Sequence, residues 1–517
     1  MPDDLPCRKR TSGKSQPRRE GLMSADDLHA FTKYQVITLL TKCIGKTLEE
    51  IDRAGVLKGK ARNKGFVGNV IEQSVFGYPA DSKQRPDLIV DGVDTELKST
   101  GIVTDKGDYE FQAKEPMSIT AVSPETITTE QFSSSHFWKK LEHLLLVYYF
   151  YAGRDVPYSE FVIKGFEFHE WDAEDIDILK SDWTLVRNFI SRVQEQFEDY
   201  ESQYPRISSE LNRELMYTDT SPKWPNRPRF RLKRRVVTSL VQNHFGIKGE
   251  ALPDDYSTYS QLDAKCHELT LAHAGKTINE LLDVYYASTD NSEAPDESSL
   301  LPQRPKTIEK GIAERLVIRM FGGTSKRMDK VELFERIGLM PKSIALTTKG
   351  GRTEDMKLMR IDFDELNDPY MKFEDSSFHD YFTQNQLLLI LFREPSTKAP
   401  LSDNEFVGFT RLWFDEQFIV QEVHRVWRRL RKLVRTNAVK IVISRKKDGT
   451  PIINQKSGTI RSAPNFPKAA EGVLFVRGTG ADSHDKVECV NGVKMYRQNL
   501  WIKGAYLAER IQGLKRL

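Results

Sequence analysis

The sequence predicts an α/β protein with two similar domains in tandem, each a mixed β-sheet flanked by helices. Three observations support this: the length of the chain, short segments that recur in order, and strand and helix periodicities around a charged hairpin. At 517 residues the chain is too long for a single ordinary core. Hydrophobic residues make up 39% and charged residues 29%, as is typical of globular proteins.

Four short segments recur, loosely and in the same order, in the two halves of the chain. The pairs are 43–50 with 273–280, 64–77 with 310–322, 134–147 with 377–390, and 230–231 with 496–497. Ordered repetition is typical of a duplicated domain, so we expect domains at 26–248 and 260–517. The composition of 249–259 is that of a linker, and residues 1–25 are expected to form a disordered basic tail.

Several protein classes are excluded by pattern. The four cysteines are scattered without Cys-x-x-Cys or Cys/His spacing, which excludes a zinc finger and gives no reason to expect a disulfide framework. No apolar run approaches the length of a membrane span, and the basic N-terminal residues lack the apolar core of a secretory signal. We therefore expect a cytoplasmic protein with no membrane association.

A phosphate-binding loop is also excluded. Gly45, Lys46 and Thr47 resemble the end of such a loop, but Leu40 stands where its earlier glycine is required. The twin segment has Thr270 at the same place.

The stretch 85–102 carries the strongest chemical signal in the sequence. It predicts a short strand, a glycine-containing turn and a second strand from about 93 to 102. Residues i and i+2 of a strand share a face, so Glu96 and Lys98 point the same way while Leu97 faces the core. Asp87, at the end of the preceding element, can converge on the same point.

These residue types suit phosphodiester hydrolysis. Two carboxylates and a backbone carbonyl can hold a hard cation such as Mg²⁺, which polarises the phosphate and lowers the pKa of a bound water. Lys98 can orient that water and offset charge on the phosphorus. A plain charged hairpin is the alternative interpretation of this motif taken alone.

The surrounding sequence resembles the MutH family of endonucleases. The resemblance rests on Lys-Gly-x-x-Gly-x-x-x-Glu at 64–72, Pro-Asp at 86–87, Gly-Val-x-x-Glu-Leu-Lys at 92–98 and Ser-His-x-x-x-Lys-Leu at 135–141. It implies a restriction-endonuclease-like PD-(D/E)xK fold, with Glu72, Asp87 and Glu96 as metal ligands. The implied catalytic residues are Glu72, Asp87, Glu96, Lys98 and Lys140. His136 is expected to be structural, since His379 repeats it in the second half.

The hairpin departs from the family pattern in one respect. The usual spacing between the aspartate and the glutamate is shorter than that between Asp87 and Glu96, and the extra residues fall in the turn. A longer hairpin in which Asp87 keeps its role is the preferred interpretation. The alternative is that Asp91 replaces it as the metal ligand.

The second domain is expected to be catalytically inactive. Aligning the repeats places the apolar Val317 or Ile318 at Glu72, Met340 at Glu96 and Leu333 near Asp87, while Thr383 replaces Lys140. A site without carboxylates cannot hold Mg²⁺ in this way.

Basic residues concentrate in the tail, in 227–235 and in 425–447, although the net charge is only +3. Local basic patches suit the phosphate backbone of DNA, and a solvated helix or strand face is the alternative for any single run. The candidate DNA contacts are Lys64, Arg231, Lys233, Arg234, Arg477, Lys494, Tyr496 and Arg497.

The arrangement resembles restriction enzymes with tandem MutH domains, in which the first copy cuts and the second binds another recognition site as an effector. The resemblance implies a type II restriction endonuclease making Mg²⁺-dependent double-strand cuts in DNA at GATC. Because each chain has one active domain, we expect a dimer on double-stranded DNA, with a cognate DNA methyltransferase as functional partner. The alternatives are a mismatch-repair-type nicking endonuclease and a DNA-binding protein that does not cleave.

Overall fold

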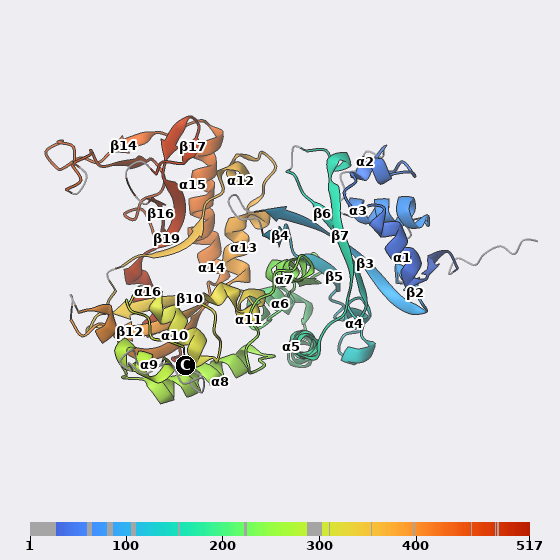
Figure 1. The fold of residues 1–517 in the computed structure, drawn as a ribbon, viewed down its shortest axis with the longest axis horizontal. Helices are drawn as coiled ribbons and strands as arrows, with labels where there is room; N and C mark the ends of the chain where they lie inside the picture. The colour runs from blue at the N-terminus through green and yellow to red at the C-terminus, as the bar shows by residue number, and fades with distance from the viewer. Residues whose placement is uncertain are drawn as a thin grey trace, which may run out of the picture.

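The computed structural model describes most of the chain (Figure 1). The described residues are 27–58, 65–79, 86–104, 110–153, 156–221, 225–286, 302–309, 311–352, 354–396, 399–455, 458–480, 482 and 485–517. The tail expected at 1–25 lies outside these residues. Within the described residues, no helix combines the length and the apolar character needed to cross a bilayer.

The first half of the chain is built on a mixed sheet with strand order β1-β2-β3-β6-β7, and β4 pairs with the far end of β3. The strands are β1 (Ala30–Phe31), β2 (Leu88–Val90), β3 (Val93–Thr104), β4 (Phe111–Ala113), β6 (Leu144–Phe150) and β7 (Val162–His169). Strands β3 and β6 run parallel, with Glu96 opposite Leu144 and Ile102 opposite Phe150. This central parallel pair is flanked by antiparallel neighbours.

Helices cover both faces of this sheet because its central strand is apolar on both sides. Leu145 and Val147 of β6 pack in a cluster with the helices α1 (Lys33–Thr41), α2 (Leu48–Ile51) and α3 (Phe66–Val70). Leu144, Leu146 and Tyr148 face the opposite way, toward α5 (Ala173–Gln196) and α7 (Arg234–His244). The period of two along β6 thus produces a helix–sheet–helix sandwich.

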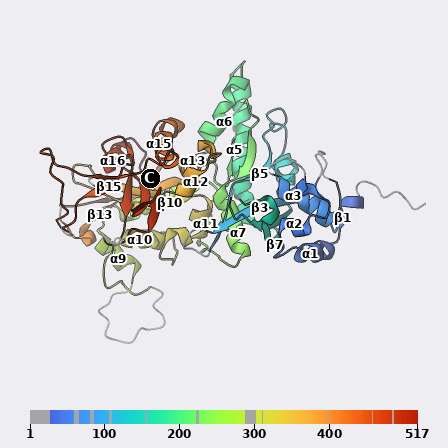
Figure 2. The ribbon, with the colours of Figure 1, turned by 90° about the horizontal axis from the view of Figure 1, so that it is seen from above.

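A smaller sheet completes the first half. It consists of β5 (Met117–Ala121), β9 (Arg229–Leu232) and β8 (Thr218–Asp219), and β9 leads directly into α7. The remaining helices are α4 (His136–Lys139) and α6 (Pro205–Leu211). In the turned view, α5 and α6 rise between the two halves (Figure 2).

The second half repeats the central strand pairing of the first half. Strands β10 (Leu339–Leu346) and β12 (Gln386–Arg393) are parallel, and β13 (Glu405–Leu412) is antiparallel to β12. A second sheet contains β11 (Met356–Arg360), β19 (Arg497–Ile502) and β16 (Leu474–Thr479). The helices are α8 (Tyr259–His273), α9 (Ile278–Tyr285), α10 (Ile312–Met320), α11 (Glu332–Arg336), α12 (Phe363–Asn367), α13 (Ser377–Gln384), α14 (Glu416–Phe418), α15 (His424–Arg435) and α16 (Gly504–Gln512).

The recurring segment 43–50 forms the same corner as its counterpart 273–280. In each, the glycine has positive φ, 81° at Gly45 and 86° at Gly275, which glycine adopts without strain. The N–H of Gly45 donates to the carbonyl of Ile163 at 2.8 Å, and that of Gly275 to Phe406 at 2.9 Å. A Thr–x–x–Glu capping box then begins the next helix in both halves.

The two halves share one apolar cluster. Buried residues of α5 and α7 in the first half belong to the same cluster as those of α8, α10 and α11 in the second. The connecting stretch is part of this packing. Glu250 pairs with the backbone of Lys330 and Glu332, and its carboxylate accepts the Ser325 N–H at 2.6 Å. Residues 249–259 are therefore packed against the second half, which their linker-like composition did not predict.

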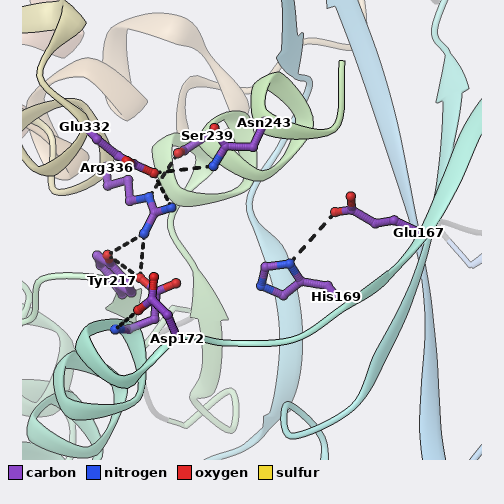
Figure 3. A network of polar contacts seen from close by, with 9 residues as sticks. Glu167, His169, Asp172, Tyr217, Ser239, Asn243, Glu332 and Arg336 are labelled. Atoms are coloured by element: carbon purple, nitrogen blue, oxygen red, sulfur yellow. Dashed lines mark hydrogen bonds and ion pairs between the residues drawn. The ribbon is translucent and has the colours of Figure 1, made fainter. Parts of the chain in front are cut away.

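Arg336 of α11 is the polar hub of this boundary (Figure 3). Its guanidinium donates to Asp175 at 2.5 Å, to the Tyr217 hydroxyl at 3.3 Å and to Ser239 at 3.0 Å, all in the first half, and it also pairs with Glu332. Burial raises the pKa of the Asp175 carboxyl, and Arg336 opposes that shift. Without Arg336, Asp175 is a buried charge lacking its cation.

We predict that Arg336→Met lowers the free energy of unfolding by about 3 kcal/mol, because it leaves Asp175 buried without its ion pair. The measurement is urea denaturation followed by tryptophan fluorescence. Lys330→Met is the matched control, since Lys330 pairs with Glu110 across the same boundary but Lys330 is exposed and Glu110 only half-buried. The control should cost less than about 1 kcal/mol. Equal losses in the two variants would contradict a special role for Arg336.

Candidate active site

The β2–β3 hairpin brings Asp87 beside Glu96. Leu88 pairs with Thr95 and Val90 with Val93, so the turn is the two-residue Asp91-Gly92. Both turn residues have positive φ, 48° and 85°, as a tight hairpin of this twist requires. One step beyond the Leu88–Thr95 pair, the Asp87 Oδ2 accepts the backbone N–H of Leu97 at 2.9 Å.

Glu96 lies between two lysines. Its carboxylate is 5% exposed, and its Oε1 and Oε2 accept from the Nζ of Lys98 and of Lys140, each at 2.6 Å. Lys98 lies two residues after Glu96 on β3, so the two side chains share a face of the strand. Leu97, between them, packs into the apolar core on the opposite face. Lys140 follows the end of α4, so the loop before β6 supplies the second ammonium.

The charges at this point nearly balance. Burial raises the pKa of the Asp87 carboxyl, and the neighbouring Glu96 charge raises it further. Lys98, the Leu97 N–H and Lys140 act in the opposite direction. Two carboxylates and two ammonium groups thus meet at one edge of the central strand pair, where an added cation would be attracted by Asp87.

Glu72 faces the same cleft as the hairpin carboxylates. Helix α3 continues into the π-helix Ile71–Phe76, and Gly65, Gly68, Asn69 and Glu72 all line the cleft together with Asp87 and Glu96. Their spacing places them on one side of the helix. The glycines leave the cleft floor open, since a Cβ at Gly65 would meet no atom within 4 Å.

The family model described as DNA mismatch repair enzyme MutH matches residues 76–182. That range covers the hairpin, Lys98 on β3 and Lys140 after α4. That segment is similar to MutH. Over 538 aligned residues the chain is also 22% identical to the type II restriction enzyme Sau3AI of Staphylococcus aureus, with 93% of this chain and 99% of the relative covered. The relative therefore matches both halves, whereas the family model matches part of the first.

The MutH-type domain opens onto a cleft of about 1840 Å³ that lies between the two halves. Its first-half side includes Arg231, Arg234 and Lys114. Its second-half side carries the carboxylates of Asp362, Asp364, Glu365, Asp368, Glu374, Asp375, Asp380, Asp415 and Glu416. Burial raises the pKa of Asp380 to about 6 and that of Glu365 to about 7. The first-half side also carries Glu72, Asp87, Glu96, Glu115 and Asp219, but beside these it has several cations, so the excess of acidic residues lies on the second-half side.

Asp91 lies away from this cleft. Its Oδ2 accepts the backbone N–H of Lys33 at 3.2 Å and its own N–H donates to Phe31 at 2.9 Å, which fixes the hairpin tip to the start of α1. It is absent from the residues lining the cleft, whereas Asp87 lines it. The geometry thus favours Asp87 over Asp91 as a partner for Glu96.

The basic strand before α7 is only partly available to DNA. Arg231 lines the cleft but is held by Asp219 through two hydrogen bonds of 2.8 and 3.0 Å. Arg234 also lines it, and its Nε donates to the Ala113 carbonyl at 2.7 Å. Lys233 is among the residues that line the cleft, but its burial disfavours the predicted DNA contact. That side chain is 3% exposed and bonds inward to the Leu215 carbonyl.

Of the other candidate contacts, Lys64 lies outside the described residues. Arg477 is exposed, pairs with Asp355 at 2.7 Å and stacks on Phe475 and Trp501. Lys494 and Arg497 are exposed and Tyr496 is half-buried, and all three lie on β18 (Val493–Met495) and β19 or between them. None of these second-half residues lines the cleft, so they form a separate surface.

The second half lacks the carboxylates of the MutH-type site. Met340 pairs with Leu387 as Glu96 pairs with Leu144, and Lys342 pairs with Leu389 as Lys98 pairs with Leu146. Val317 and Ile318 are buried in α10. Lys342 therefore remains at the position of Lys98, with Met340 in place of the carboxylate of Glu96.

Sequence reasoning missed two cleft residues, Lys114 and Tyr151. The Lys114 ammonium lies 4.3 Å from the centre of the Tyr151 ring, and both line the cleft beside Lys98. Lys114 follows β4 and Tyr151 follows β6. Because these two positions are far apart in the sequence, no local motif joins them. His136, expected to be structural, is exposed and pairs with Glu130 at 3.0 Å.

We predict that Asp87→Asn stabilises the metal-free protein at pH 7, because the raised pKa of Asp87 means that its charged form is disfavoured by folding. The charged Asp87 carboxylate lowers the stability of the folded protein. This cost is full above the pKa of Asp87 in the folded state and disappears below its pKa in the unfolded state, about 4. The gain in urea midpoint over the parent should therefore shrink from pH 7 to pH 4. The control is Asp91→Asn, which removes an exposed charge in the turn but keeps an oxygen that can accept the Lys33 N–H, and it should show no gain that shrinks with pH. A variant less stable than the parent at pH 7 would refute the prediction.

Proposed function

We propose that the protein is a type II restriction endonuclease that hydrolyses double-stranded DNA at a specific site with Mg²⁺ as cofactor. The observation that carries the proposal is the meeting of Asp87, Glu96, Lys98 and Lys140 at one point of a MutH-type domain. Similarity along 93% of the chain to a type II restriction enzyme supports the site-specific deoxyribonuclease class.

The residues at the hairpin suit a magnesium ion. Burial and the neighbouring Glu96 charge raise the pKa of Asp87, and a divalent cation would relieve both effects; oxygen ligands are those that Mg²⁺ prefers. The described residues contain no ready group of three His, Cys, Asp or Glu side chains for a metal. Asp87 and Glu96 would therefore hold the ion together with the Leu97 carbonyl and water, with Glu72 contributing from across the cleft. Bound there, Mg²⁺ would polarise the scissile phosphate.

The lysines supply the remaining charge. Lys98 lies in the cleft beside Glu96, where its ammonium can orient a water for attack and offset negative charge on the phosphate. Lys140 holds the other Glu96 oxygen and fixes the direction in which that carboxylate points. The cleft lining brings Arg231, Arg234 and Lys114 near enough to position the DNA backbone.

The finer assignments rest on the family resemblance and on the layout of the two halves. We propose GATC as the recognition sequence and a tandem organisation, with residues 26–248 cutting and 260–517 binding a second site as effector. Support comes from the matched corners, capping boxes and β-ladders of the two halves, and from Met340 at the position of Glu96. Arg477, Lys494, Tyr496 and Arg497 are the proposed effector contacts. Double-strand cutting by one site per chain implies a dimer on DNA, with a GATC methyltransferase protecting the host.

The test is digestion of one plasmid, unmethylated or GATC-methylated, with Mg²⁺ or with EDTA. We expect discrete fragments ending at GATC that disappear with EDTA. Nicked circles alone would instead indicate a repair-type nicking enzyme. Binding to GATC duplexes without any cutting would indicate a DNA-binding protein.

We predict that Lys98→Ala lowers the single-turnover cleavage rate at least 100-fold, because a preorganised cation at the reacting phosphate contributes a factor of this order. Lys342→Ala is the matched control, since it removes the lysine at the same ladder position of the second half. The control should cleave within about twofold of the parent. Comparable losses in both variants would show that the effect is not catalytic.

We predict that Arg497→Ala weakens the stimulation of cleavage by a second GATC duplex added in trans, and leaves unstimulated cleavage unchanged. Arg497 is exposed on the second half and outside the catalytic cleft. Losing one phosphate or base contact should raise the activating concentration of that duplex by about tenfold. Unchanged stimulation would remove Arg497 from the effector surface.

A further inference from the structure

Residues 440–464 form an arm that leaves the second half after α15 (Figure 1). Its stem pairs β14 (Ile441–Ile443) with β15 (Ser462–Pro464) in antiparallel register. Beyond the stem, bridges between Arg445 and Pro451 and between Ile453 and Ile460 define two short fingers. The fingers diverge where the backbones of Ser444, Ile452 and Arg461 bond to one another.

The arm exposes apolar side chains on both of its faces. The exposed fractions are 45% for Ile441, 45% for Val442, 40% for Ile443, 60% for Ile453 and 51% for Ile460. Alternation along β14 places Ile441 and Ile443 on one face and Val442 on the other. A two-stranded ribbon without a covered face is marginal by itself, and such apolar exposure marks an interaction surface.

The arm is also strongly basic. Among its described residues the cations are Lys440, Arg445, Lys446, Lys447 and Arg461, all exposed, and the acidic residue is Asp448. Those five minus one give a net charge of +4. None of these cations forms an ion pair with a described residue, and Asp448 is occupied by Thr450. Helix α15, which precedes the arm, adds further positive charge. Its exposed cations are Arg428, Arg429, Lys432 and Arg435.

We infer that this arm binds duplex DNA, with the stem ribbon in a groove and the lysines of the first finger on phosphates. This inference rests on the proposed function and adds a DNA-binding element to it. A two-stranded β-ribbon has the width of the major groove, and exposed aliphatic side chains can contact thymine methyl groups there. The net charge of +4 favours a polyanion over a second copy of the arm, which it would repel.

The arm serves a different stretch of DNA from the one being cut. It lies at the far end of the second half from the β2–β3 hairpin, and none of its residues lines the catalytic cleft (Figure 1). The turn between β17 (Glu488–Val490) and β18 is tied to the end of α15, where the arm begins, because the Asn491 side-chain amide donates to the Val434 carbonyl at 3.1 Å. The arm therefore extends the effector surface.

The test uses the full-length chain in EDTA, so that binding is measured without cutting. Fluorescence anisotropy with a GATC duplex at several salt concentrations compares the parent with Lys446→Gln/Lys447→Gln. Loss of two phosphate contacts should weaken binding about tenfold and reduce the salt slope of log K by about two. The matched control is Lys515→Gln/Arg516→Gln, which removes two exposed cations at the C-terminus, away from the arm.

Ile441→Ser/Ile443→Ser tests the groove contact, since both side chains are exposed and their loss leaves the core intact. It should weaken binding while leaving the salt slope unchanged. Unchanged affinity in both arm variants would overturn the inference. So would a loss of dimer mass in sedimentation with affinity retained, which would mean that the arm contacts a second copy. If the unmodified protein binds no DNA, the proposed function itself is refuted. That failure is distinguishable from failure of the arm inference because it is seen without any arm variant.

Discussion

The parallel pairing of β3 with β6 determines most of what this protein can do. The ladder fixes Glu96 opposite Leu144, so the chain that precedes β6 must pass the start of β3 and bring Lys140 onto the Glu96 carboxylate. The antiparallel hairpin on the other side of β3 places Asp87 at the same level. Three segments distant in sequence meet because backbone hydrogen bonds align their ends.

The second half repeats this ladder without its acidic chemistry. Met340 and Lys342 stand at the ladder positions of Glu96 and Lys98 on β10, which pairs in parallel with β12 as β3 does with β6. Strand β12 in turn pairs antiparallel with β13, as β6 does with β7. The scaffold thus persists where the carboxylates are missing. What the second half presents instead is a basic, partly apolar outer surface and, toward the cleft, a wall of carboxylates.

Much of the catalytic constellation could be predicted from local sequence. The period of two fixed the common face of Glu96 and Lys98, and Asp-Gly at 91–92 marked the hairpin turn. Lys140 required the family resemblance, because its distance from Glu96 is set by tertiary structure. Lys233 shows the limit of such reasoning. Alternation along β9 would put it on the face of Arg229 and Arg231, but it lies after the strand at the N-cap of α7, where its side chain is buried. Lys114 and Tyr151 meet only through folding, and no local pattern joins them.

The apolar cluster that the halves share has a consequence for protein engineering. Helix α7 packs on α11, and buried residues of α5, α8 and α10 complete the same cluster. A chain truncated after residue 248 would expose the inner face of α5 and α7 to water. The halves are therefore not interchangeable cassettes, and a chimaera that transplants the first half should carry α8 to α11 with it.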